Sequence, residues 1–170
     1  MQLKSGTDNA KYLAELIEIA GGQVVGRTRL QKIAYLLELT GLGNGLSYQY
    51  KHYGPFSQDL ASASELATMF GKITEEKKPT NWGGHYSVFS VDGSKTGDDI
   101  KSQIVSLARD ANPVDLELAA TAAYLSDTGF DEPWEETSRR KPEKSSRIES
   151  AKILYSKLAS IPTPQPWPQI

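Results

Sequence analysis

The sequence predicts an α+β protein that is mostly helical and carries a small antiparallel hairpin. Three observations support this class. Apolar residues recur at helical spacing in several segments, a tyrosine-rich stretch has the composition of a strand, and two short segments around a glycine-rich turn have the pattern of a hairpin. The length of 170 residues, with 38% hydrophobic residues, suits one domain with a real core.

Two helices are expected first. Asp8 or Thr7 can cap the first helix, which ends at Gly21-Gly22, and the second helix follows Gly26 and stops at Gly41. Each has one apolar face, made by Leu13, Leu16, Ile17 and Ala20 in the first helix and by Leu30, Ile33, Ala34 and Leu37 in the second.

A strand, a third helix and a hairpin follow. Aromatic residues favour a strand over Ser47–Tyr53, which Gly54-Pro55 then breaks. Ser57 can cap a third helix that closes at Gly71. The hairpin is expected to pair residues 72–77 with residues 85–91 around a turn over residues 79–84.

The remaining chain is predicted to form a helical block over residues 98–159. Asn112-Pro113 has the pattern of an N-cap followed by proline, and Ser146 with Glu149 has capping-box spacing for the last helix. A short helix is expected over Asp131–Arg140. Residues 161–170 hold four prolines and are expected to be extended or disordered.

This order of elements has the outline of a winged helix over residues 8–93, packed on the helical block. We therefore predict a single domain over residues 1–160 and a proline-rich tail over residues 161–170.

Composition excludes several functional classes. The formal charge is −2, so affinity for nucleic acid would need a local basic patch. The chain has no cysteine and only two histidines, His52 and His85, which excludes thiolate chemistry and histidine-rich metal sites. Its first residues lack the apolar region of a signal peptide, so we expect none, and it has no apolar run long enough for a membrane helix. We expect a cytoplasmic protein with no cofactor, no metal and no membrane partner.

Two groups of motifs carry a resemblance. The first is Gly26-Arg27-Thr28-Arg29-Leu30-Gln31-Lys32 followed by Tyr53-Gly54-Pro55-Phe56-Ser57, and the second is Leu116-Glu117-Leu118-Ala119-Ala120-Thr121 followed by Lys141-Pro142. Together they resemble the YwgA-like proteins of bacteria and archaea and, more distantly, the Panacea (SocA-like) antitoxin domain, over residues 8–159. The resemblance implies a bacterial antitoxin-like protein, in a toxin–antitoxin or phage-defence setting, that acts by direct contact with a partner protein. It implies no catalytic residues.

Six residues are candidates for partner binding. Arg27, Arg29 and Lys32 begin the second helix, where cations oppose the helix dipole. Either an internal carboxylate offsets them, or a bound phosphate or acidic partner does. Tyr53 and Phe56 either belong to a turn or flank a groove. Trp167 either docks on a partner or packs back on its own domain; these candidates are Arg27, Arg29, Lys32, Tyr53, Phe56 and Trp167.

No motif for an enzyme is present, since the sequence has no nucleophile elbow, no phosphate-binding loop and no zinc-protease motif. We therefore predict a non-catalytic protein-binding module that occludes a partner, and a homodimer is compatible with the sequence. The alternative is a winged-helix transcriptional regulator. Against it, the outward positions of the third helix carry no basic residue, and the basic run over residues 139–147 is expected to be a solvated loop away from that helix.

Overall fold

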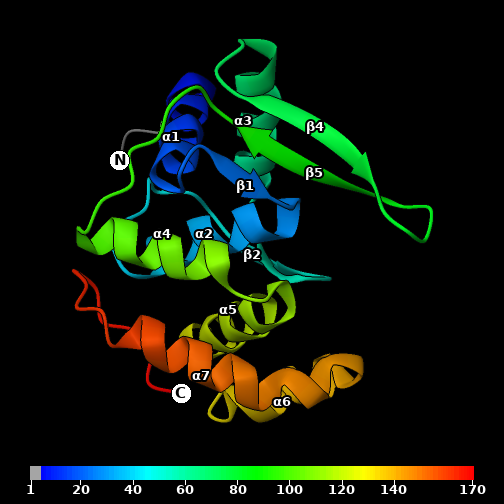
Figure 1. The fold of residues 1–170 in the computed structure, drawn as a ribbon. Coiled ribbons are helices and arrows are strands. Elements are labelled where there is room, and N and C mark those ends of the chain that lie inside the picture. The colour runs from blue at the N-terminus through cyan, green and yellow to red at the C-terminus, as the bar shows by residue number, and fades with distance from the viewer. Residues whose placement is uncertain (1–4) are drawn as a thin grey trace.

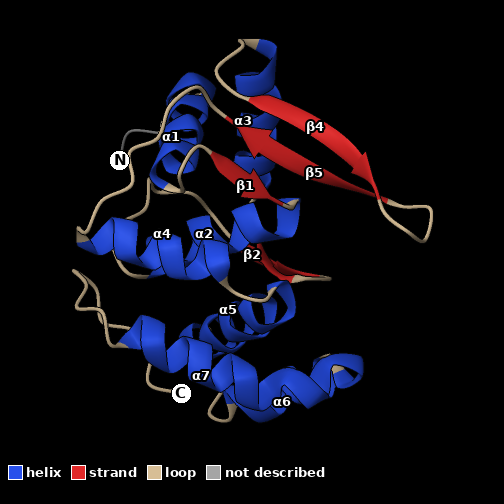
Figure 2. Cartoon of the chain, in the orientation of Figure 1, coloured by secondary structure: helices blue, strands red, loops and turns tan. Residues whose placement is uncertain are grey.

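The structure, a computed structural model, describes residues 5–170 (Figures 1 and 2). Its helices and strands confirm the α+β, mostly helical class. In chain order they are α1 (Gly6–Ile19), β1 (Gln23–Val25), α2 (Arg27–Leu39), β2 (Gln49–Lys51), β3 (Gly54–Phe56), α3 (Gln58–Met69), β4 (Thr74–Pro79), β5 (His85–Ser90), α4 (Ile100–Asp110), α5 (Pro113–Asp127), α6 (Pro133–Arg140), the 3₁₀ helix η1 (Pro142–Arg147) and α7 (Ile148–Ala159).

The larger sheet has three antiparallel strands in the order β1-β5-β4. The predicted hairpin is present as β4 and β5, which project away from the helices (Figure 1). β1 was not expected, because three residues between two glycine turns are too short for an alternating pattern. It pairs with β5 from Gln23 opposite Ser90 to Val25 opposite Val88. Apart from the short strands β2 and β3 between α2 and α3, the element order and the strand order are those expected of the predicted winged-helix outline.

The second sheet corrects one expectation. Gly54-Pro55 was predicted to break a strand, but the chain turns earlier, at His52 and Tyr53, and β3 pairs back on β2. Proline is tolerated in so short a strand because its missing N–H need not lie in the ladder. The result is a small hairpin, β2–β3, between α2 and α3 in the chain.

Helix caps are partly as expected. Ser57 caps α3, and Asn112 caps α5 with Pro113 at its first position. The first helix begins earlier than predicted, because Ser5 and Asp8 form a capping box in which Asp8 is the third residue of the helix. The predicted capping box at Ser146 is wrong: this residue lies in η1, and α7 has no side-chain cap.

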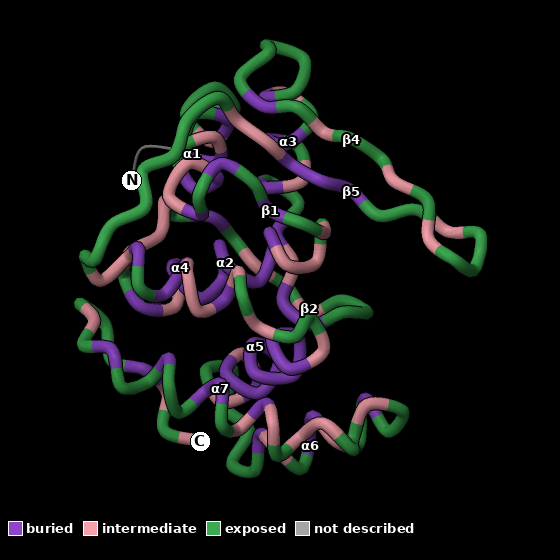
Figure 3. The backbone as a smooth tube through the Cα atoms, viewed as in Figure 1, coloured by how far each residue is buried: buried purple, intermediate pink, exposed green. Residues whose placement is uncertain are grey.

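The helices are arranged in layers around one continuous apolar core. Helices α5, α6 and α7 form a layer below α2 and α4, while α1, α3 and the three-stranded sheet lie on the other side (Figure 1). The buried cluster draws side chains from both the winged-helix-like part and the helical block. Buried residues concentrate along α2 and α5, whereas the tip of the β4–β5 hairpin is exposed (Figure 3).

The proline-rich tail is extended and packs on the domain. Trp167 is buried, and its indole N–H donates to the Ile161 carbonyl at 3.0 Å. The backbone N–H of Gln165 donates to the Thr40 carbonyl at 3.0 Å, and the Tyr155 hydroxyl donates to the Pro168 carbonyl. In the described residues, no helix has both the length and the apolar character that a bilayer crossing requires.

Candidate functional site: the β2–β3 hairpin and its pocket

Two neighbouring residues of α2 hold the segment that follows the β2–β3 turn. Gln31 is buried and makes two hydrogen bonds with the backbone of Ser57: its amide N–H₂ donates to the carbonyl and its amide oxygen accepts from the N–H, both at 2.9 Å. Lys32 donates from Nζ to the Pro55 carbonyl at 2.8 Å. These contacts give the Gln31-Lys32 pair a structural role, because each satisfies backbone groups that are buried.

Gly54 permits α5 to approach the hairpin closely. Its φ of +94° lies in the region that disfavours a side chain, and a Cβ there would overlap the Thr121 hydroxyl oxygen on α5. Thr121 is fully buried. Glycine is therefore required at this position both by the backbone conformation and by the packing of α5 against β3.

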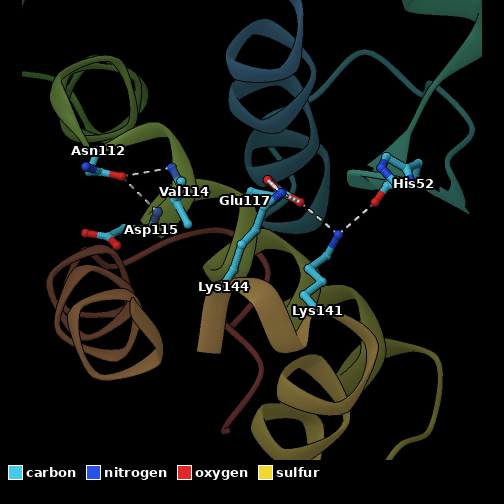
Figure 4. Close-up of polar contacts among 7 residues, drawn as sticks. All are labelled: His52, Asn112, Val114, Asp115, Glu117, Lys141 and Lys144. Carbon is cyan, nitrogen blue, oxygen red and sulfur yellow. Dashed lines mark hydrogen bonds and ion pairs between the residues drawn. The ribbon is translucent and has the colours of Figure 1, made fainter. Parts of the chain in front are cut away.

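A charged cluster ties α5 to the chain after α6. Glu117 is buried on α5 and accepts from Lys141 Nζ at 2.8 Å and from Lys144 Nζ at 2.8 and 2.9 Å. Lys141 also donates to the His52 carbonyl at 2.8 Å, so it reaches the turn of the β2–β3 hairpin (Figure 4). The hairpin is thus held from one side by Gln31 and Lys32 of α2 and from the other by α5 and Lys141. We name these contacts the polar clamp, and they are made by Gln31, Lys32, Gly54, Glu117, Lys141 and Lys144.

Lys32 lies close enough to this cluster to interact with its charges. Burial lowers the pKa of the Lys32 amine to about 7, and the positive charges of Lys141 and Lys144 act in the same direction. The negative charge of Glu117 opposes the shift only in part. Three amines therefore lie near one buried carboxylate, and loss of the Lys32 proton as the pH rises through about 7 relieves the excess of positive charge.

A pocket of about 390 Å³ opens beside this clamp, between α2, the β2–β3 hairpin, α3 and the sheet. Its walls are mainly apolar, and the charged residues that also line it are Arg27, Lys32, Lys51, Glu65 and Glu75. The apolar part of the lining includes Leu30, Phe56, Leu60, Ala61 and Phe89. An apolar cavity with a few polar groups at its edge is the usual form of a binding site.

The three cations at the start of α2 have different partners. Arg27 is exposed and pairs with Glu75 on β4, its Nε and Nη2 lying 3.0 and 2.6 Å from the carboxylate. Burial alone would raise the pKa of Glu75, but hydrogen bonds from Ser87 and Arg27 outweigh it and hold this pKa below its usual value. For Arg27 the internal ion pair is therefore the alternative that the structure shows.

Arg29 requires a correction. It was expected beside Arg27 on a binding surface, but its guanidinium turns toward the end of α4, where Nη1 donates to the carbonyls of Ala108, Arg109 and Ala111 at 2.7 to 3.1 Å. These carbonyls have no partner within the helix, and a cation offsets the negative end of the helix dipole there. Burial lowers the pKa of Arg29. Lys32 likewise is not on the surface but buried in the clamp.

Of the three aromatic candidates, two lie at the pocket and one is buried elsewhere in the domain. Tyr53 is half exposed at the hairpin turn, and Phe56 forms part of the pocket wall with Lys51 Nζ 4.5 Å from its ring centre. Trp167 lies away from the pocket, with its ring packed edge-on against Tyr155. Because it is buried by its own domain, Trp167 is not available for docking.

The basic run over residues 139–147 is not the solvated loop that was expected. Besides the lysine contacts with Glu117, Arg140 pairs with Glu136 at 2.7 Å, and Arg147 makes two hydrogen bonds to Asp115 at 2.6 and 2.8 Å. The run therefore fastens η1 and α6 onto α5, and little of its charge is left for a partner.

Sequence reasoning did not single out Glu117 or Thr121 as site residues. An observation that could have done so is a lone carboxylate in the apolar run of α5, because a buried acid requires a cationic partner elsewhere. Within residues 5–170, no group of three or more histidine, aspartate or glutamate side chains is placed to hold a metal ion.

The fold and the site define an α+β protein with an apolar pocket held open by a buried polar clamp. Comparisons of the chain with protein-family models, with curated proteins and with solved structures found no match. Residues from the two groups of sequence motifs lie together in the fold, since Gln31, Lys32, Gly54, Glu117 and Lys141 all belong to the clamp.

Proposed function

We propose that this protein is a non-catalytic, cytoplasmic binding module of the antitoxin-like kind, which acts by capturing and covering a segment of a partner protein. The observation that carries the proposal is the apolar pocket beside the β2–β3 hairpin. Its volume of about 390 Å³ suits one or two large side chains of a partner.

The surroundings of the pocket have the composition of a protein-binding surface. Tyr53 presents an exposed aromatic ring on the hairpin turn, and Arg27 presents an exposed guanidinium that a partner carboxylate could share with Glu75. Aromatic residues and arginine contribute most of the binding energy in many interfaces. Hydrogen bonds from the clamp hold the hairpin that forms one wall of the pocket, and a wall ordered before binding reduces the entropy lost on association.

A crosslinking experiment tests this placement. A benzoylphenylalanine at Ala61, which lines the pocket, should capture a partner in the native host, whereas the same group at the exposed Ser156 on α7 should not. The captured partner is then purified and titrated against Ala61→Trp, which fills the pocket. We expect affinity to fall at least tenfold, and an unchanged affinity would place the interface elsewhere.

A duplex-reading winged helix is the second candidate, and the strand order β1-β5-β4 favours it. In that arrangement α3 would enter the major groove, yet its exposed residues include the acids Asp59 and Glu65 and no basic side chain. Gel-shift assays at low salt distinguish the two proposals. A shift with duplex DNA that Gln58→Ala abolishes would favour α3 as the reading element.

A further inference from the structure

The outer half of the β4–β5 hairpin has a surface unlike the rest of the protein. Over residues 77–86 it carries Lys77, Lys78 and His85 and no acidic residue, whereas the whole chain carries a net charge of −2. Within the described chain, neither lysine forms an ion pair. The tip carries Trp82, which is 85% exposed and the most exposed large hydrophobic side chain of the described residues.

The strand register places these groups on both faces of the hairpin. Lys78 lies directly opposite Tyr86 on one face, and Lys77 lies opposite Ser87 on the other. Tyr86 is 40% exposed, so an aromatic ring and an amine share the first face. The hairpin projects from the body (Figure 1), and Lys77, Trp82 and Tyr86 are exposed on it.

On the Lys77 side the hairpin borders an open hollow of about 750 Å³. Lys77, His85 and Arg27 contribute to its lining, and no acidic side chain does. Glu75, the nearest acid on this face, accepts from both Arg27 and Ser87 and also interacts with the charge of Lys77, so one carboxylate faces two cations and the face is positive in net charge. A surface of this charge attracts a polyanion.

The exposed indole of Trp82 favours a polyanion that carries aromatic rings, since such rings can stack on it. Unpaired bases stack on aromatic side chains, and cations beside those rings follow the phosphates, which is how single strands are bound without sequence preference. In a duplex the faces of the bases are covered by their neighbours, and the acidic exposed face of α3 would repel the phosphates. We infer that the outer half of the β4–β5 hairpin binds single-stranded nucleic acid, with Trp82 stacking on a base and Lys77 and Lys78 contacting phosphates.

Fluorescence anisotropy of fluorescein-labelled oligothymidine with the full chain tests this inference. Binding is expected at about 50 mM salt and should weaken as salt increases. Trp82→Ala should weaken it about tenfold, within the range for loss of one stacked base. Lys77→Gln with Lys78→Gln should reduce the slope of log affinity against log salt by about 1.4, or about 0.7 for each phosphate that is no longer neutralised.

Matched controls lie on other exposed surfaces. Phe70→Ala removes an exposed aromatic ring at the end of α3, and Lys11→Gln with Lys157→Gln removes two exposed amines from α1 and α7; neither should change binding. Lys78 is partly buried and the other substituted side chains are exposed, so the variants should fold. The inference is overturned if oligothymidine does not bind at low salt, if polyglutamate competes equally well, or if duplex DNA binds as tightly and is insensitive to Trp82→Ala.

Discussion

Glu117→Gln is the sharpest test of the polar clamp. The substitution keeps the shape of the side chain but removes the carboxylate that receives Lys141 and Lys144. At 2.8 Å and an effective dielectric constant of about 20, each pair contributes about 6 kcal/mol of attraction before the cost of desolvation is subtracted. What remains in the variant is a buried Lys141 without a counter-charge.

Breaking a buried pair in this way costs about 3–5 kcal/mol. Since a domain of this size is stable by about 5–15 kcal/mol in total, the loss should be plain in urea unfolding followed by circular dichroism. Glu143→Gln is the matched control, because Glu143 is an exposed acid on η1 beside the same lysines, and its effect should stay below about 0.5 kcal/mol. A loss of less than about 1 kcal/mol for Glu117→Gln would refute the clamp.

Three further predictions concern the clamp and the tail. Gly54→Ala should lower the free energy of unfolding by about 2–4 kcal/mol, because the new Cβ would overlap Thr121 as well as strain the backbone. Gly129 has a similar φ but no atom within 4 Å of a Cβ at its position, so Gly129→Ala should cost only about 1–2 kcal/mol. Equal losses would disprove the overlap. Between about pH 7 and 10.5, Lys32 carries a proton in the unfolded chain but not in the folded chain. The free energy of unfolding of the wild type relative to Lys32→Met should therefore rise with pH by up to about 1.4 kcal/mol per pH unit in urea unfolding. A difference that does not change with pH would contradict the lowered pKa. Trp167→Ala should lower the free energy of unfolding by about 3 kcal/mol, which thermal unfolding would measure. It should also expose the chain after Ile161 to proteases in limited proteolysis. A variant as stable and as resistant as the wild type would mean that the tail does not stabilise the core.

Local patterns predicted most of the helices and the outer hairpin. The apolar face of α1, the Asn112-Pro113 start of α5 and the Ser57 cap of α3 are properties of neighbouring residues, so the sequence alone indicated them correctly. Strand β1 and the pairing of β3 with β2 were missed, because strands of three residues form only when a distant partner supplies the ladder.

The candidate site was anticipated only in part. Arg27, Tyr53 and Phe56 do lie around the pocket. Arg29 was placed on the same surface because it is two residues from Arg27, yet its guanidinium reaches carbonyls 79 to 82 residues away. Glu117 had no role before the fold placed it between Lys141 and Lys144.

The sequence by itself determined the helical periodicity and the caps of α3 and α5, because these depend on residues a few positions apart. Only the tertiary structure decided which charges are consumed internally. No acidic partner of Arg27, Lys141 or Arg147 can be identified from the sequence, but each meets an acid that lies 24 to 48 residues away along the chain. Ion pairing depends on distance in space, and the basic groups left without such a partner are the ones that a ligand can use.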